Sequence, residues 1–194
     1  MSRRRAQALL VAVGLAPIAV LLFRFFLGDG LGAEPIEAVT HVTGEWALRL
    51  LLATLAVTPL RVVFGWRQLA PFRRTLGLLA FTYATLHMLT WLALDQFFDW
   101  TYIVEDVIER PYITVGLLAF LCMVPLAATS TSTMIRRLGR RWITLHRLAY
   151  VAAIAAVVHY LWLVKADLLA PLAHAAVLAT LLGWRLLDAR RRRS

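Results

Sequence analysis

The stretch LHRLAYVAAIAAVVHYLW, residues 145–162, combines a long apolar run with a histidine near each end. His146 and His159 are separated mostly by Ala, Val and Ile. A helix needs roughly 20 predominantly apolar residues to cross a bilayer core of about 30 Å. With its flanking residues the window 144–164 has that length, so we predict a membrane-spanning helix that carries two imidazoles.

Five more windows of this kind occur in the chain, which has 194 residues, is 61% hydrophobic and has a mean hydropathy of +0.71. The first window is longer than the apolar region of a secretory signal peptide, about 7–15 residues, so we expect a retained helix. No segment between the windows is long enough to bury a core of its own. The sequence therefore predicts an all-α integral membrane protein, a six-transmembrane-helix bundle in which residues 1–194 form a single domain. The windows are approximately 8–26, 46–64, 75–94, 112–128, 144–164 and 168–187.

The charged residues between the windows predict the orientation in the membrane. Most bases lie before the first window, after the sixth, and between the second and third and the fourth and fifth: Arg3, Arg4, Arg5, Arg61, Arg67, Arg73, Arg74, Arg136, Arg137, Arg140, Arg141 and residues 190–193. The other segments hold Asp29, Glu34, Glu37, Asp95, Asp99, Glu105, Asp106, Glu109 and Asp167, with only Arg110 and Lys165 as bases. Because excess arginine and lysine mark the cytoplasmic face, we predict that both termini are cytoplasmic. The net charge of +10 is then a topology signal, and no nucleic-acid partner is expected.

Several kinds of site are disfavoured by missing motifs. The single cysteine, Cys122, lies inside the fourth window, so neither a disulfide within the chain nor an iron–sulfur cluster is expected. A Cys-x-x-Cys-His motif for covalent haem attachment is missing, as is a glycine-rich phosphate loop. The sequence also shows no evident internal repeat.

Histidines inside the windows carry the functional hypothesis, because ionisable groups in membrane helices are costly and are usually functional. His87 lies about 18 Å along the third helix, and His159 lies about 19.5 Å beyond His146 on the fifth. Both helices enter from the cytoplasmic side, so His87 and His159 reach similar depths. Two neutral imidazoles at one depth on neighbouring helices can hold one haem b iron between them.

Other interpretations of these histidines stay open. A membrane histidine can simply form hydrogen bonds with a neighbouring helix or with water. A zinc site is less favoured, because no carboxylate or cysteine lies at the same depth. His41 is expected in an outer loop, and His174 in the sixth helix has no evident partner.

His146 is the candidate ligand of a second haem near the inner surface. A symmetrical design would place a histidine at the start of the third helix, but Arg73 and Arg74 stand there. Arginine is a poor iron ligand and a good partner for haem propionates, although both residues could equally be cytoplasmic anchors. Moreover, thirteen residues of ideal helix turn the side chain by about 220° beyond full turns, so His146 and His159 would face different ways.

Two features belong to the outer surface. The segment QFFDWTYIVEDVIER, residues 96–110, alternates apolar and acidic residues and could form an interfacial helix. In the second helix, Arg49 could balance a propionate of the outer haem, or pair with Glu45 one turn earlier.

Together these residues resemble a known family, MsrQ (also called YedZ), within the ferric-reductase-like transmembrane group. The resemblance covers nearly the whole chain in order, and the combination of stretches is specific where each alone would be weak. The stretches are GLGAEPIEAVTHVTG (30–44), LLATLAVTPLR (51–61), RRTLGLLAFTYATLH (73–87), RPYITVGLLAF (110–120), TSTSTMIRRLGRRWITLHRLAY (129–150) and HYLWLVK (159–165).

The resemblance implies a haem b protein of the bacterial inner membrane that passes electrons to MsrP, a periplasmic molybdoenzyme that reduces methionine sulfoxide in oxidised proteins. It implies the quinone pool or a cytosolic flavin reductase as the electron donor, and FMN as a further possible cofactor. The family's haem histidines correspond by position to His87, His146 and His159. Unlike the larger oxidases of the group, this chain has no cytoplasmic flavin and nicotinamide domain, and it has Arg73 and Arg74 where they carry a fourth histidine.

Two other functions stand as alternatives to an electron-transfer subunit. In one, His87, His146 and His159 are titrating relays of a proton channel or transporter. In the other, the protein is a non-redox membrane anchor for a periplasmic partner. A haem spectrum separates the electron-transfer function from both.

Overall fold

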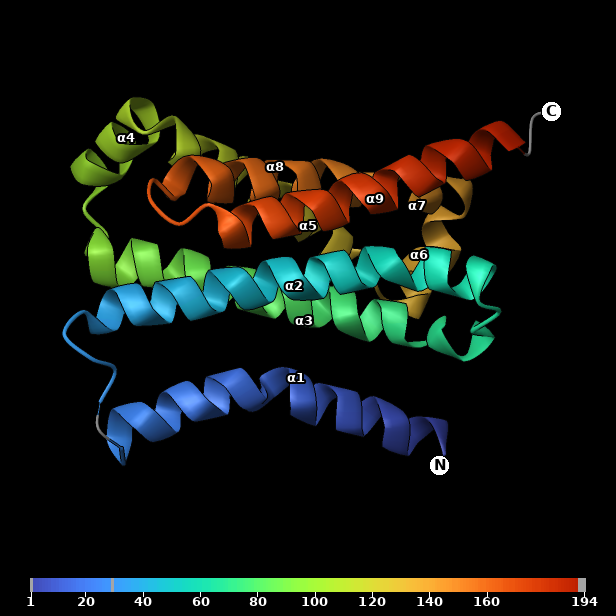
Figure 1. Cartoon of the computed structure of the whole chain (residues 1–194), viewed down its shortest axis with the longest axis horizontal. Helices are drawn as coiled ribbons and strands as arrows, with labels where there is room; N and C mark the ends of the chain where they lie inside the picture. The colour runs from blue at the N-terminus through green and yellow to red at the C-terminus, as the bar shows by residue number, and fades with distance from the viewer. Residues whose placement is uncertain (1, 29, 192–194) are drawn as a thin grey trace.

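The computed structural model describes residues 2–28 and 30–191, and Figure 1 shows them as a bundle of long helices. The acidic residue Asp29 and the basic residues Arg192 and Arg193, used above to predict orientation, lie outside this part. The helices are α1 (Arg3–Phe26), α2 (Pro35–Val63), α3 (Phe72–Leu89), α4 (Trp100–Glu109), α5 (Pro111–Ala128), α6 (Ser132–Leu138), α7 (Arg140–Leu145), α8 (Leu148–Leu163) and α9 (Leu169–Arg191). A 3-10 turn, η1 (Arg67–Leu69), precedes α3, and a π-helical turn, η2 (Thr90–Asp95), continues it.

Six helical segments of the described chain are long and apolar enough to span a membrane, which confirms the prediction. They are α1, α2, α3 with η2, α5, α7 with α8, and α9. The second span differs most from its window, since α2 begins at Pro35 rather than near residue 46. Proline is favoured at the first helical position, where its missing N–H costs nothing. His41 therefore lies within α2, and its expected place in a loop was wrong, because hydropathy marks the apolar part of a helix and not its polar extension.

The start of α1 and the end of α9 lie at the same end of the bundle (Figure 1). An even number of spans has this consequence, and it agrees with the prediction that both termini share one side of the membrane. Which side is cytoplasmic stays a prediction from the arginine distribution. Helix α4 lies at the opposite end of the bundle (Figure 1), which we refer to as the outer end.

Helices α2, α3, α5 and α8 form the centre of the bundle. Leu55, Ala80, Ala152 and Ala153 are fully buried there. Small side chains at helix contacts let backbones approach closely, which is the usual basis of packing in membranes. The alanines of α8 therefore explain why a segment with so little side-chain volume lies inside the bundle.

Helix α1 packs at the edge of this centre. Of its residues only Gly14 is buried, and most of its large apolar side chains are exposed, as expected of a surface that faces lipid. It contacts α3, where the buried Tyr83 hydroxyl donates a hydrogen bond of 2.7 Å to the Gly14 carbonyl. A Cβ at Gly14 would lie 2.6 Å from Leu79 Cδ1, so a larger residue there would require the Leu79 side chain to move.

The fifth span is not one continuous helix. Helix α7 ends at Leu145 and α8 begins at Leu148, so His146 and Arg147 form a turn between them. The angle expected for ideal helix therefore does not apply to the two histidines. The polar TSTST segment, residues 129–133, leads into a helix: α6 begins at Ser132, and the Thr131 hydroxyl accepts a hydrogen bond of 3.2 Å from the Met134 N–H.

Candidate haem site

A cavity of about 270 Å³ lies between the four central helices. Its walls are mostly apolar, with Leu48, Leu51, Phe120 and Met123 among them. An apolar cavity with a few polar groups is typical of a site for a cofactor with a large hydrophobic ring. The histidines predicted at equal depth, His87 and His159, both line it.

His87 and His159 are oriented alike by main-chain carbonyls. His87 Nδ1 lies 3.0 Å from the Thr40 carbonyl oxygen, and His159 Nδ1 lies 2.7 Å from that of Tyr112. In the tautomer in which Nδ1 carries the proton, each ring donates this hydrogen bond and keeps the lone pair of Nε2 available. That is the usual arrangement of a metal-binding histidine.

The two rings lie at a separation suited to one metal ion. Their centroids lie 6.1 Å apart and their planes are inclined at 77°. Two imidazoles that bind a metal from opposite sides, with bonds of about 2.0 Å, have centroids roughly 6 Å apart. The centroid spacing therefore matches that of two imidazoles that bind one iron.

The number of possible metal ligands at the cavity favours a haem iron over a zinc ion. Within residues 2–28 and 30–191, no three or more His, Cys, Asp or Glu side chains are grouped to hold a metal ion. A zinc ion would need such a group, because the protein supplies at least three of its ligands. A porphyrin brings four nitrogen ligands of its own, so a pair of histidines completes the coordination of haem iron.

Each imidazole packs against a glycine of the neighbouring helix. A Cβ added at Gly44 of α2 would lie 3.0 Å from His87 Nδ1 and Cε1. A Cβ added at Gly116 of α5 would lie 2.8 Å from His159 Nδ1. Any larger residue would push the ring away from its position, so both glycines belong to the site.

The site is built from an internal repeat. Each histidine follows its carbonyl partner by 47 positions, and adding 72 to Thr40, Gly44 and His87 gives Tyr112, Gly116 and His159. The pair α2 and α3 therefore corresponds to the pair α5 and α8 in these contacts. The repeat is not evident in the sequence, because the corresponding side chains mostly differ and only their places in the fold match.

His146 lies away from this cavity, at the opposite end of α8. Its ring stacks on Trp142, with centroids 3.8 Å apart, and its Nδ1 is 3.1 Å from the Trp142 carbonyl oxygen. The half-buried Arg73 is close enough to interact electrostatically with His146. The exposed Arg74 is the residue that corresponds to His146 in the repeat. Neither arginine lines the cavity of His87 and His159.

The remaining candidates divide between the cavity and its surroundings. His41 is at the cavity edge, with Nε2 3.5 Å from Glu37. His174 bonds through Nδ1 to the Ala170 carbonyl of its own helix, at 2.7 Å. Arg49 forms an ion pair with Glu45, one of the two partners considered for it, with Nη2 2.6 Å from Oε2.

Sequence reasoning missed the carbonyls of Thr40 and Tyr112, the two glycines and Arg110, which also lines the cavity. A usable signal was present in the equal spacing of two Thr/Tyr-x-x-x-Gly segments and two later histidines. Each segment lies just inside a helix that starts with proline, Pro35 or Pro111.

Comparisons with known proteins agree with this site and fold. A six-span bundle with paired histidines facing an apolar cavity defines a ferric-reductase-like membrane component, and residues 43–157 match the family described as ferric reductase like transmembrane component. A protein of Rhodospirillum rubrum named protein-methionine-sulfoxide reductase heme-binding subunit MsrQ is 55% identical over 169 residues, which cover 87% of this chain and 81% of that protein. A protein of the same name from Xanthomonas axonopodis pv. citri is 50% identical over 185 residues, covering 93% and 85%. No solved structure matches the chain. This chain belongs to the MsrQ family, and it is a multi-pass membrane protein.

Proposed function

We propose that this protein is the haem b-binding membrane subunit of a methionine sulfoxide reductase system and transfers electrons across a bacterial inner membrane. The observation that carries the proposal is the pair His87 and His159, each held by a carbonyl through Nδ1 across an apolar cavity. Haem b supplies one-electron redox chemistry when bound. The protein contributes ligands, orientation and the exclusion of water, and no substrate chemistry of its own.

His87 and His159 are the proposed iron ligands of the outer haem. Their hydrogen bonds to Thr40 and Tyr112 select the tautomer and raise the basicity of Nε2. The apolar walls keep water from the iron, which affects the redox potential. The relatives named heme-binding subunits support the binding of a haem by this chain.

His146 is the proposed ligand of an inner haem, with Arg73 and Arg74 as candidate contacts for its propionates. Its place in the turn between α7 and α8 leaves the ring outside regular helix packing. The basic segments at this end also suit an electron donor with negative charge. We propose the quinone pool or a cytosolic flavin reductase as the donor, with FMN as a further cofactor on the same face.

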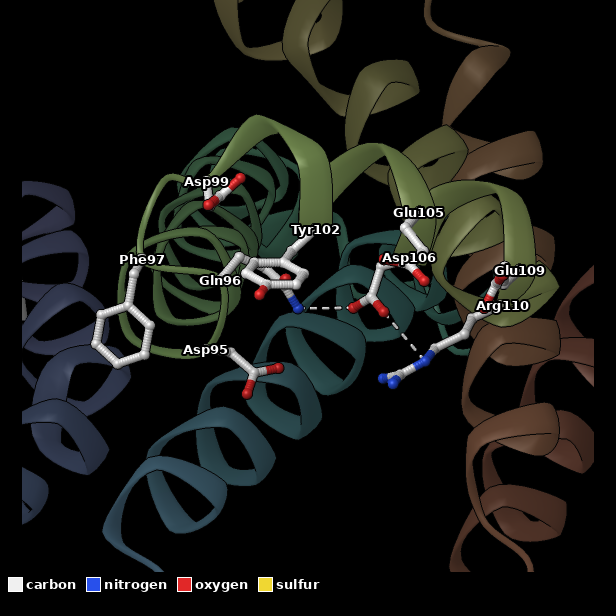
Figure 2. Close-up of a pocket in the computed structure, with 9 residues that line it drawn as sticks. All are labelled: Asp95, Gln96, Phe97, Asp99, Tyr102, Glu105, Asp106, Glu109 and Arg110. Carbon is white, nitrogen blue, oxygen red and sulfur yellow. Dashed lines mark hydrogen bonds and ion pairs between the residues drawn. The ribbon is translucent and has the colours of Figure 1, made fainter.

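The proposed electron acceptor is a periplasmic molybdoenzyme of the MsrP kind, docked at the outer end. Figure 2 shows the hollow at that end, which is lined by Asp95, Gln96, Phe97, Asp99, Tyr102, Glu105, Asp106, Glu109 and Arg110. With five acids to one base, this hollow would attract a partner with a basic patch. Exposed aromatic residues at its rim, Phe97 and Tyr102, are of the type that contributes most to protein interfaces.

An optical spectrum of the purified protein tests the proposal. The protein should have a Soret band that shifts on reduction by dithionite, and pyridine haemochrome analysis gives the number of haems. His87→Ala and His159→Ala should each lose the outer low-spin component. His174→Ala is the matched control and should keep it, because that ring bonds within α9. A full spectrum in both cavity variants would refute the ligand pair, and a colourless protein that conducts protons in liposomes would favour the relay function.

A further inference from the structure

The cavity of His87 and His159 meets the outer surface at two charged residues. Asp95 and Arg110 line both the cavity and the hollow of Figure 2. They therefore form the mouth of the cavity, where an enclosed ligand would reach toward water. Among the described residues that line the cavity, Arg110 is the only arginine or lysine.

Arg110 is held in place by Asp106, a carboxylate that is only 8% exposed. Arg110 Nε lies 3.1 Å from Asp106 Oδ1. The other oxygen, Oδ2, accepts a hydrogen bond of 2.6 Å from Gln96 Nε2 and a longer one of 3.5 Å from Trp91 Nε1. A buried carboxylate with this many hydrogen-bond donors is fixed in its position.

The ion pair with Asp106 uses Nε and leaves the two terminal nitrogens out of it. Together these two nitrogens can bind a second carboxylate in a fork. Figure 2 shows them extending away from Glu109, on the side of Asp95. The Asp106 carboxylate is the main reason that the pKa of Arg110 is raised. Tyr112, to which the Arg110 side chain is also hydrogen-bonded, and Asp95 contribute further, so the guanidinium stays charged.

The backbone adds to this positioning. Arg110 ends α4 and directly precedes Pro111, the first residue of α5. A residue before proline is confined to extended conformations, and Arg110 has φ −113° and ψ 89°. The arginine is thus fixed at its base as well as at Nε.

The other charged residues of the cavity are less suited to bind an anion. Glu45 repels anions and is paired with Arg49 at 2.6 Å. His41 is neutral unless protonated and faces Glu37 at 3.5 Å. Asp95 opposes an anion directly, so Arg110 must offset it.

We propose that Arg110 binds a carboxylate of the ligand in the histidine cavity, and that Asp106 positions it for this. The inference rests on the proposed function, in which the ligand is haem b and the carboxylate is a propionate. The porphyrin ring matches the apolar walls, and the two propionates need cations at an edge that reaches water. Arg110 then secures the haem and raises its midpoint potential, because a nearby cation stabilises the reduced form, which has one more negative charge.

The test uses the full-length haem-loaded protein in detergent, with two measurements. A redox titration followed in the Soret band gives the midpoint potential, and transfer of haem to apomyoglobin gives its rate of loss. Arg110→Gln should lower the potential and speed haem loss about tenfold or more. A change of this size is expected when one charge-assisted hydrogen bond is lost. Asp95→Asn should change both quantities in the opposite direction, because it removes the opposing charge.

Further variants separate positioning from general loosening of the fold. Asp106→Asn should speed haem loss although it removes a negative charge near the site. Arg110→Lys keeps the charge without the fork, so its potential should stay near that of the wild type while haem loss is faster. Arg67→Gln, an exposed arginine near the other end of the bundle, is the control and should change neither quantity.

The outcomes distinguish this inference from the proposed function. A wild-type protein that binds no haem would overturn both. Normal haem content with unchanged potential and haem loss in Arg110→Gln would overturn the inference alone. The inference would also be overturned if Arg110→Gln and Asp95→Asn shifted the potential in the same direction. Slower or equal haem loss in Asp106→Asn would exclude the positioning role of Asp106.

Discussion

The imidazoles of His87 and His159 lie edge to face with centroids 6.1 Å apart, and each bonds to a carbonyl 47 positions earlier in the chain. The two halves of the site thus have one construction, repeated in two helix pairs. In each half, the histidine of α3 or α8 is anchored through Nδ1 to the first turns of α2 or α5, and its ring packs on a glycine of that helix one turn further on.

Alanine at Gly116 should displace His159, and alanine at Gly44 should displace His87. The added Cβ would lie 2.8 Å from the first ring and 3.0 Å from the second, so the effect should be larger at Gly116. Forcing such a methyl group into packed structure costs about 1–3 kcal/mol, or roughly 5- to 150-fold in haem affinity. Haem titration of the low-spin spectrum measures this. Gly77→Ala is the matched control, since its Cβ would meet Thr54 at an ordinary 3.7 Å; an equal loss in that variant would contradict the explanation.

Phenylalanine at Tyr83 should weaken the attachment of α1 to the bundle. The change removes the hydroxyl that donates to the Gly14 carbonyl and leaves the packing of the ring intact. Hydrogen bonds between membrane helices contribute about 0.6 kcal/mol on average and up to about 1.7. The free energy of unfolding in mixed micelles should fall by an amount in this range, whereas Tyr102→Phe, at an exposed residue, should leave it unchanged. A drop as large in the control would argue against a specific role of the bond.

Charge reversal on α4 should slow electron delivery to a basic periplasmic partner. Glu105→Lys with Glu109→Lys removes the attraction of the outer hollow, and the bimolecular rate at low ionic strength should fall by about tenfold or more. The difference should shrink in high salt, because screening weakens forces between exposed charges. Asp106 is left unchanged, since its carboxylate is buried against Arg110.

The control for this prediction is charge reversal at Glu34 and Glu37, which precede or begin α2 and do not line the hollow. It should have a much smaller effect on the rate. Equal slowing by both pairs of substitutions would indicate a general field rather than docking at α4. An unchanged rate at low salt in the α4 variant would remove this surface from the proposal.

Cysteine labelling in whole cells tests the orientation. The sequence has a single cysteine, the buried Cys122, so Cys122→Ala gives a background without thiols. In that background a membrane-impermeant maleimide should label Tyr102→Cys, at the outer end, from outside the cell. Ile135→Cys, in the arginine-rich α6, should react only after the cells are opened. The reverse pattern would place both chain ends outside and would contradict the arginine rule here.

The six spans were predictable from the sequence because a helix in lipid must satisfy its own backbone hydrogen bonds and must be long enough to cross the apolar core. Both conditions are local, so they are readable from hydropathy. The equal depth of His87 and His159 was also predictable, since depth along a helix follows from residue number and rise per residue. The start of α2 at Pro35 was not, because polar residues outside the lipid can extend a helix without any hydropathy signal.

Tertiary packing decided everything that depends on how the helices are rotated and how closely they approach. Residue numbers alone place Gly116 and His159 on different helices, and only the contact between α5 and α8 brings the ring so close that a methyl group at Gly116 would lie 2.8 Å from it. The same holds for Arg110. The sequence indicates only an arginine in a loop, whereas the structure places it against Asp106 and the cavity. Lipid imposes length and apolarity on each helix separately, whereas the site arises from side chains of four helices, whose relative positions are set by mutual packing.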